Sequence, residues 1–276
     1  MSALVARARA LIALDGALAA TVLAVFGYFT VSVSFLGCLV PLFAFTTLVG
    51  WQATHLAVWL GAASLLPIAP AVYALLRATR LLLAERGEAR AAREFWTAFA
   101  EGCRHLWWAA VGVSAVALIL GYDLALFGGA DAVLLLAAVG AALAVALLIG
   151  VCVVRGSVST VNAGVSSAGA GAPSAGRPVA GFRSLSERGT SETKRLERTS
   201  YAGALDTLAA AAKAIARRPH IALSWLLLIG LGLAATAIPL LGPALALFLP
   251  ALVGAGIHIC NDALRLTRPD ETSHTP

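Results

Sequence analysis

Residues 130–154 read ADAVLLLAAVGAALAVALLIGVCVV, and this stretch decides the class of fold. It holds a single charged residue, Asp131, in a run longer than the about 20 apolar residues that cross a bilayer as a helix. Five further runs are long and apolar in the same way: 11–35, 40–64, 106–126, 221–238 and 240–264. The sequence therefore predicts an all-α fold, a polytopic transmembrane helix bundle with six spans.

The composition supports a membrane protein. Hydrophobic residues make up 60% of the 276 residues and charged residues only 12%, whereas about 25% of a soluble domain is charged. The formal net charge is +6, but the basic residues flank the apolar runs and do not form one stripe. This pattern predicts contact with the anionic surface of a lipid bilayer and argues against binding of nucleic acid.

The basic residues also predict an orientation. All 20 Lys and Arg residues fall within residues 1–10, 65–105, 155–220 and 265–276. Lys and Arg accumulate on the cytoplasmic side of membrane proteins. We therefore expect a multi-pass protein of the inner (cytoplasmic) cell membrane with its N- and C-termini in the cytoplasm. Arg7 and Arg9 precede an apolar run that exceeds the about 7–15 residues of a signal peptide, which favours an uncleaved first span.

The stretches between the runs divide the chain. We predict a four-span membrane part over 1–154 with cytoplasmic amphipathic helices at 65–105, a flexible Gly/Ser-rich cytoplasmic linker at 155–200, an amphipathic helix and two-span membrane part at 201–264, and a cytoplasmic tail at 265–276. Residues 66–84 fit two interpretations. They form an interfacial helix, or they continue the second span beyond a bend at Pro67 and Pro70.

Three short motifs carry a family resemblance. They are LLPIAPAVYALLR at residues 65–77, EFWTAF at 94–99, and Arg217-Arg218-Pro219 before the fifth run. In their order and place they resemble the YesL family of small polytopic bacterial and archaeal membrane proteins. The long Gly/Ser linker and the extended N-terminal run depart from that pattern. The resemblance implies an accessory role beside carbohydrate uptake systems, and it implies no catalytic residue.

Polar residues inside the predicted spans are the candidate functional groups, because such groups are costly in lipid. The candidate intramembrane polar site consists of His55, His258, Asp262 and Asp15. His258 and Asp262 are four residues apart and share a helix face. Together with Asp15 they predict a cytoplasm-facing polar pocket or a proton-handling site. The alternative is that these side chains reach water at the interface or bond neighbouring backbone carbonyls.

No catalytic motif is present, and the four cysteines lack metal-ligand spacing, so the sequence predicts a protein that is not an enzyme and holds no cofactor or metal. Trp96 and Phe99 in an amphipathic segment predict contact with a partner, either a membrane transporter complex or a second copy of the chain. We expect an accessory component of solute transport, with carbohydrate as one candidate solute. The alternative is an autonomous small transporter or channel that uses the intramembrane His and Asp residues.

Overall fold

The computed structural model describes residues 17–50, 54–85, 91–127, 131–169, 189–239 and 242–263, and within these ranges the regular structure is helical throughout. The helices are α2 (Ala17–Cys38), α3 (Val40–Leu48), α4 (His55–Ser64), α5 (Ile68–Glu85), α6 (Ala91–His105), α7 (Trp107–Phe127), α8 (Asp131–Gly169), α9 (Gly189–Arg217), α10 (Pro219–Thr236) and α11 (Gly242–Ala263).

Within the described residues, six stretches are long and apolar enough to cross a membrane: Thr21–Cys38, His55–Ala84, Trp107–Leu124, Asp131–Gly156, Pro219–Thr236 and Ala244–Ala263. The predicted all-α bundle with six membrane-spanning helices is thereby confirmed. Large side chains such as Leu56, Leu136 and Leu227, all within these stretches, are more than two-thirds exposed. In a multi-pass membrane protein such side chains face lipid, so their exposure costs nothing.

The second span differs from its prediction. Residues 40–64 were expected to form one span, but the chain turns back between α3 and α4. Gly50 lies in this turn with φ of 70°, a backbone conformation that glycine adopts without steric cost. The side chain of Thr54 then caps α4 by accepting a hydrogen bond from the Ala57 N–H at 3.3 Å. The predicted span at 40–64 is therefore wrong, and the membrane-crossing stretch is His55–Ala84.

Helix α5 lies at the centre of the bundle and packs against α2, α6, α7, α8 and α11. Its buried residues are Ala69, Pro70, Ala71, Tyr73, Ala74, Leu75, Leu76, Ala78, Thr79 and Leu82. The many alanines allow the neighbouring helices to approach closely. A short turn at residues 65–67, beside Pro67, joins α5 to α4. Of the two interpretations of residues 66–84, the structure shows the bent continuation of the second span.

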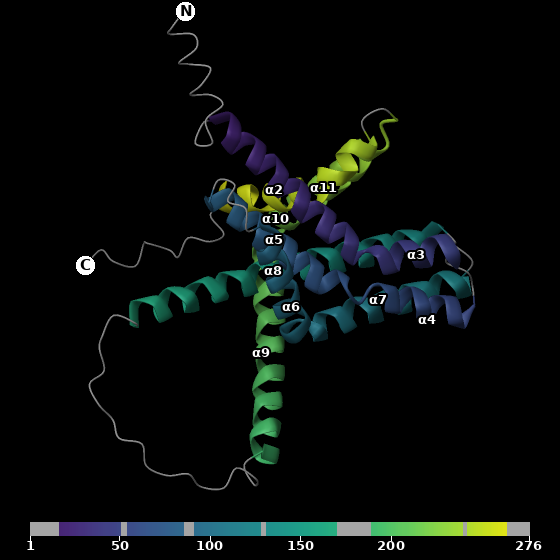
Figure 1. Ribbon diagram of the computed structural model, residues 1–276. Helices are drawn as coiled ribbons and strands as arrows, with labels where there is room; N and C mark the ends of the chain where they lie inside the picture. The colour runs from purple at the N-terminus through teal and green to yellow at the C-terminus, as the bar shows by residue number, and fades with distance from the viewer. Residues whose placement is uncertain are drawn as a thin grey trace, which may run out of the picture.

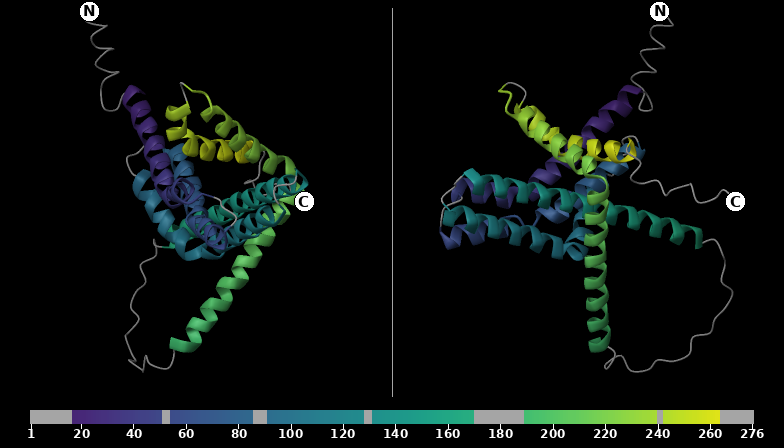
Figure 2. Two further views of the ribbon diagram at one scale, coloured as in Figure 1. Left: turned by 90° about the vertical axis from the view of Figure 1, so that its right-hand side faces the viewer. Right: turned by 180° about the vertical axis from the view of Figure 1, so that it is seen from behind.

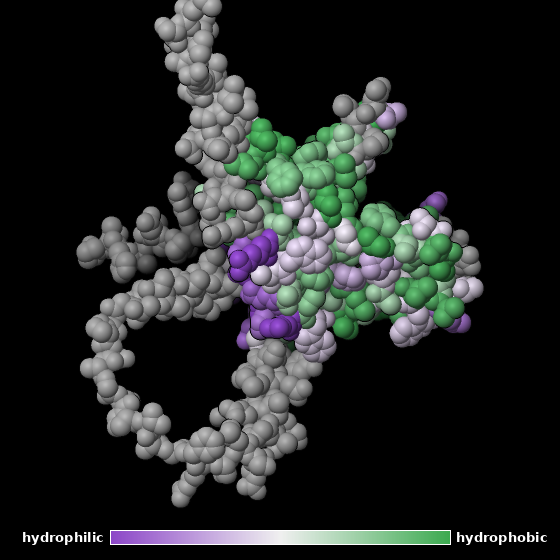
Figure 3. Space-filling view, viewed as in Figure 1, coloured by the Kyte–Doolittle hydropathy of each residue, from purple (hydrophilic) through white to green (hydrophobic). Residues whose placement is uncertain are grey.

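The bundle has two ends that the views in Figures 1 and 2 show clearly. The turn between α3 and α4, the last residues of α7 and the first residues of α8 lie together at one end, here called the turn end. The other end is called the basic end. Arg77 and Arg80 in the second half of α5 lie toward it, as does Arg104, which comes just before α7 begins. Figure 3 shows hydrophilic surface gathered around α6, with hydrophobic surface over α2, α11 and α3.

Helices α8 and α9 extend into the range predicted as a flexible linker. Helix α8 continues past residue 154 to Gly169, and α9 begins at Gly189, so residues 155–169 and 189–200 are helical instead. The middle of the predicted linker, 170–188, lies outside the described residues. Helix α9 packs on α8 and crosses the bundle direction in Figures 1 and 2. It leads directly into α10, whose first residue is Pro219.

Ser32 of α2 forms hydrogen bonds with the backbone of α11 beside Pro250, where the regular helix hydrogen bonding is interrupted. Pro250 lies within α11 and has no N–H to give to the helix. Ser32 of α2, which is fully buried, donates its hydroxyl to the Phe248 carbonyl at 3.3 Å and accepts from the Ala251 N–H at 3.1 Å. One hydroxyl thus satisfies two backbone groups beside the proline, as a membrane interior requires.

Candidate functional site

Polar side chains gather at the basic end, where α5 and α11 meet. Arg80, His258, Asn261 and Asp262 line a cavity of about 250 Å³, together with apolar side chains such as Val153 of α8. The Nε2 atom of His258 lies 2.7 Å from the carbonyl oxygen of Leu76 and, as an N–H, donates to it. His258 and Asp262, which were expected to form a polar pocket together with Asp15, thus line the same cavity as Arg80 and Asn261.

Asn261 is the buried member of this cavity, with 2% of its surface exposed. Its Oδ1 atom accepts a hydrogen bond from the indole Nε1–H of Trp225 in α10 at 3.1 Å. Its Nδ2 atom is buried and has no hydrogen-bond partner among the described residues. The role of Trp225 was missed from the sequence. The available signal was that an indole N–H inside a span needs an acceptor.

His55 lies at the turn end and does not join this cavity. Its Nδ1 atom is 2.9 Å from the hydroxyl of Tyr122, near the end of α7, and the two rings lie 5.5 Å apart. His55 is exposed at the start of α4. The candidate polar site is therefore divided between two ends of the bundle, with His258 and Asp262 at one and His55 at the other. Asp15 lies outside the described residues.

An apolar groove adjoins the polar cavity. It has a volume of about 440 Å³ and runs from Leu39 and Phe43, beside the α3 helix, to Leu76 and Ile257. Helices α2, α5, α8, α10 and α11 also contribute to its walls. Among the described residues that line the groove, only Thr236 has a polar side chain. A volume of this size is in the range of small-molecule sites.

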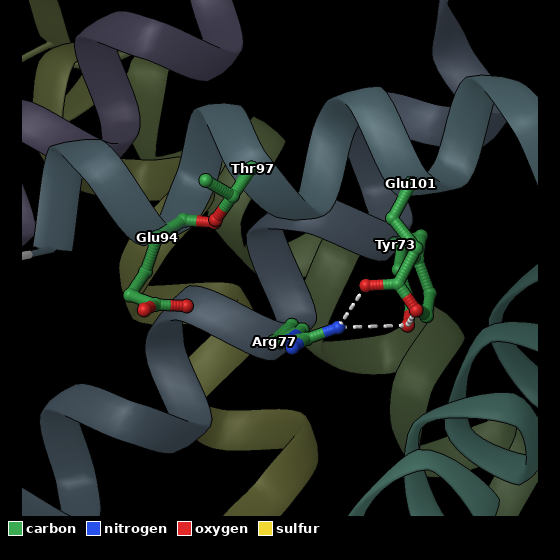
Figure 4. Close-up of polar contacts among 5 residues, drawn as sticks. All are labelled: Tyr73, Arg77, Glu94, Thr97 and Glu101. Atoms are coloured by element: carbon green, nitrogen blue, oxygen red, sulfur yellow. Dashed lines mark hydrogen bonds and ion pairs between the residues drawn. The ribbon is translucent and has the colours of Figure 1, made fainter. Parts of the chain in front are cut away.

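Helices α5 and α6 are clamped together by a polar contact (Figure 4). Arg77 forms an ion pair with Glu101, and the Tyr73 hydroxyl donates to Glu101 Oε1 at 3.4 Å. Arg77 also donates to the Tyr73 hydroxyl at 3.4 Å. The two helices approach so closely that a Cβ atom on Gly102 would lie 3.1 Å from the Cα of Pro70. The sequence showed these residues as helix faces but did not pair them.

The aromatic residues of α6 have different surroundings. Phe95 is fully buried, Phe99 is partly buried against the core, and Trp96 has 51% of its surface exposed. The Trp96 ring lies edge-on to both phenyl rings, at centroid distances of 5.6 Å and 5.7 Å. Of the two predicted partner-contact residues, Trp96 therefore presents most of the free surface, and Phe99 supports it.

Metal ligands are not clustered in the described residues, where no three His, Cys, Asp or Glu side chains lie together. Comparisons with protein-family models, with curated proteins and with solved structures find no match to this chain. What the chain does is therefore inferred from its own side chains.

Proposed function

We propose that the chain is a non-enzymatic accessory component of a solute-transport complex, and that α6 binds the partner. The observation that carries this proposal is the outward face of α6, on which Arg93, Trp96, Thr97 and Arg104 are exposed. Trp and Arg are the residue types that dominate the binding energy of protein interfaces. Helix α6 lies outside the six membrane-spanning stretches, so this face is offered to another protein and not only to lipid.

The attachment of α6 suits a binding surface. Its other face is buried through Ala91, Phe95 and Ala98, and the Arg77–Glu101 ion pair holds it against α5. A helix fixed in this way loses little conformational freedom when a partner binds. The exposed Trp96 ring is also held by its contacts with Phe95 and Phe99. The surface is preorganised for recognition.

The place of this complex follows from the charge pattern. Of the 20 Lys and Arg residues, 17 lie outside the six membrane-spanning stretches, and Arg77, Arg80 and Arg155 lie in the last part of their stretches, toward the basic end. This asymmetry supports a cell-membrane protein with cytoplasmic termini and a cytoplasmic α6. The resemblance of residues 65–77 and 94–99 to the YesL family supports solute transport, with carbohydrate as the candidate solute, because members are associated with carbohydrate uptake systems.

Autonomous transport is less well supported by the geometry. His55 and His258 lie at opposite ends of the bundle, and the groove beside His258 has an apolar lining. A polar solute that moved through the groove would lose its hydration without gaining hydrogen bonds. Each polar group of the solute would then cost about 2–7 kcal/mol of free energy.

Site-specific photo-crosslinking tests the proposal. A photoreactive benzoylphenylalanine replaces Trp96 in the full chain, and native membranes are irradiated. The adduct is then identified by mass spectrometry. We expect an adduct with a subunit of a solute transporter. Leu227 of α10, which is 72% exposed in a membrane-spanning stretch, is the matched control and should capture lipid only.

Two results contradict the proposal. One is lipid alone at Trp96, equal to that at Leu227, which reduces the aromatic face to an interfacial anchor. The other is solute flux through purified protein in vesicles, lost in His258→Ala, which makes the chain a transporter itself. An adduct of Trp96 with a second copy of the chain instead identifies a homo-oligomer and overturns the transporter partner.

A further inference from the structure

The polar cavity and the apolar groove follow one another along three helices. On α5, Leu76 lines the groove and Arg80, four residues later, lines the cavity. On α8, Ile149 lines the groove and Val153, four residues later, lines the cavity. On α11, Gly254 lines the groove and His258, again four residues later, lines the cavity. Four residues advance a helix by about 6 Å. The cavity therefore lies one helical turn beyond the groove, toward the basic end, on every helix that they share.

A single hydrogen bond marks the boundary between the two spaces. His258 belongs to the cavity and Leu76 to the groove, and His258 Nε2 contacts the Leu76 carbonyl at 2.7 Å. This contact binds α11 to α5 at the level where the lining changes from apolar to polar. The site thus has a hydrocarbon-like part inside the membrane and a hydrogen-bonding part at its end.

The polar part contains one group of each charge. Arg80 supplies a guanidinium and Asp262 a carboxylate, both exposed at the cavity. Asn261 adds a buried amide whose Nδ2 atom has no partner among the described residues. An unpaired buried donor is costly, and a bound acceptor would remove that cost. The cavity matches a head group that carries both an anion and a cation.

We propose that this site binds one phospholipid with a phosphate and a primary ammonium in its head group, of the phosphatidylethanolamine type. An acyl chain lies in the apolar groove. The phosphate binds Arg80, whose guanidinium matches phosphate geometry, and it accepts from the Asn261 amide. The ammonium binds Asp262. This site is separate from the α6 face, and the inference holds whichever partner that face binds.

The occupant is a lipid and not a transmembrane helix of another protein because of the polar end. A helix that filled the groove would continue as an apolar surface at membrane depth. It would leave the buried Asn261 amide without an acceptor. A phospholipid changes from hydrocarbon to phosphate over one short step, as the lining does between Leu76 and Arg80.

Native mass spectrometry tests the assignment. Full-length protein is reconstituted in vesicles of equal parts phosphatidylethanolamine, phosphatidylglycerol and phosphatidylcholine, extracted gently and measured with its retained lipid. We expect one phosphatidylethanolamine per chain. Arg80→Gln and Asp262→Asn should each lower its retention by about tenfold, as the loss of one charge-assisted contact does. Lys213→Gln, at an exposed position of α9 that lines neither space, is the charge-matched control and should retain it.

A second pair of variants keeps the test independent of the charged residues. Leu233 and Leu231 both lie on α10 and are 61% and 67% exposed, but only Leu233 lines the groove. Leu233→Trp should fill the groove and release the lipid, whereas Leu231→Trp should leave it bound. Equal retention of all three lipids shows boundary lipid only and overturns the proposal. So does a preference for phosphatidylglycerol, or a photo-crosslink from position 233 to a protein.

Discussion

A few side chains in this bundle hydrogen-bond to the backbone of another helix. Ser32 satisfies two backbone groups of α11, and His258 donates to a carbonyl of α5. Ser114 of α7 likewise donates to the Ala62 carbonyl of α4 at 2.6 Å. Lipid offers no hydrogen bonds to backbone groups that leave the regular helix pattern. Each such contact therefore fixes the register between two helices as well as their spacing.

Ser32→Ala should destabilise the protein by about 1–3 kcal/mol, because the Ala251 N–H beside Pro250 loses its acceptor in a buried place. The loss is measured by unfolding of the purified protein in detergent, followed by tryptophan fluorescence. Ser224→Ala is the matched control. Ser224 donates to the Ile221 carbonyl of its own helix, so its removal leaves no backbone donor unpaired. A Ser32→Ala protein as stable as the control contradicts this role for Ser32.

At the scale of residues, the sequence predicted the shared face of His258 and Asp262 because four-residue spacing is a local property. The partners of these residues are not local. Leu76 is 182 positions from His258, and Trp225 is 36 positions from Asn261. Such pairings depend on which helices become neighbours, and hydropathy carries no information on that. Arg80 lies within the predicted amphipathic segment at 65–105, but its cavity forms only when α11 packs on α5.

Individual helices show where the apolar pattern suffices as a predictor and where it fails. The spans at 130–154 and 221–238 were predicted close to their observed positions, because uninterrupted apolar runs have one interpretation in a membrane. The second span was displaced because residues 40–64 are apolar on both sides of the Gly50 turn. Residues 68–85 carry arginines, so an interfacial helix stayed open beside the continued span as an interpretation of what is a central, buried helix.

The α5–α6 hairpin provides a test at the same scale. Gly102→Ala should destabilise the protein by about 1–3 kcal/mol, because its Cβ would lie 3.1 Å from both the Cα and the Cβ of Pro70 and force the helices apart. Gly112→Ala in α7 is the control, since its Cβ would meet no atom within 4 Å. There alanine should stabilise by up to about 1 kcal/mol through helix propensity. Thermal unfolding in detergent compares the two, and the same sign for both contradicts the close approach.

The whole molecule is organised by its two ends, and that organisation predicts accessibility. In a chain without other cysteines, Leu48→Cys at the turn end should react with a membrane-impermeant maleimide on intact cells. Leu48 is 84% exposed. Cys103 of α6, kept as the only cysteine, should react only after the membrane is permeabilised. Burial raises the pKa of the Cys103 thiol, so its thiolate and its labelling rate increase toward alkaline pH.

The labelling is therefore done at mildly alkaline pH for both proteins. The reverse accessibility, with Cys103 labelled on intact cells and position 48 protected, contradicts cytoplasmic termini. Labelling of both positions on intact cells contradicts the separation of the two ends.

The contact of Ser32 with α11 also has a consequence for the order in which the protein is synthesised and folded. The ribosome synthesises α2 before α11. The N–H of Ala251 can therefore donate to the Ser32 hydroxyl only after more than 200 intervening residues have been synthesised. Until then the centre of the molecule has one open side, along α2 and α5, where α11 later packs. Insertion into the membrane and completion of the fold are thus distinct events for this chain. Helices α2 and α5 are inserted in the membrane before α11 is available to pack against them.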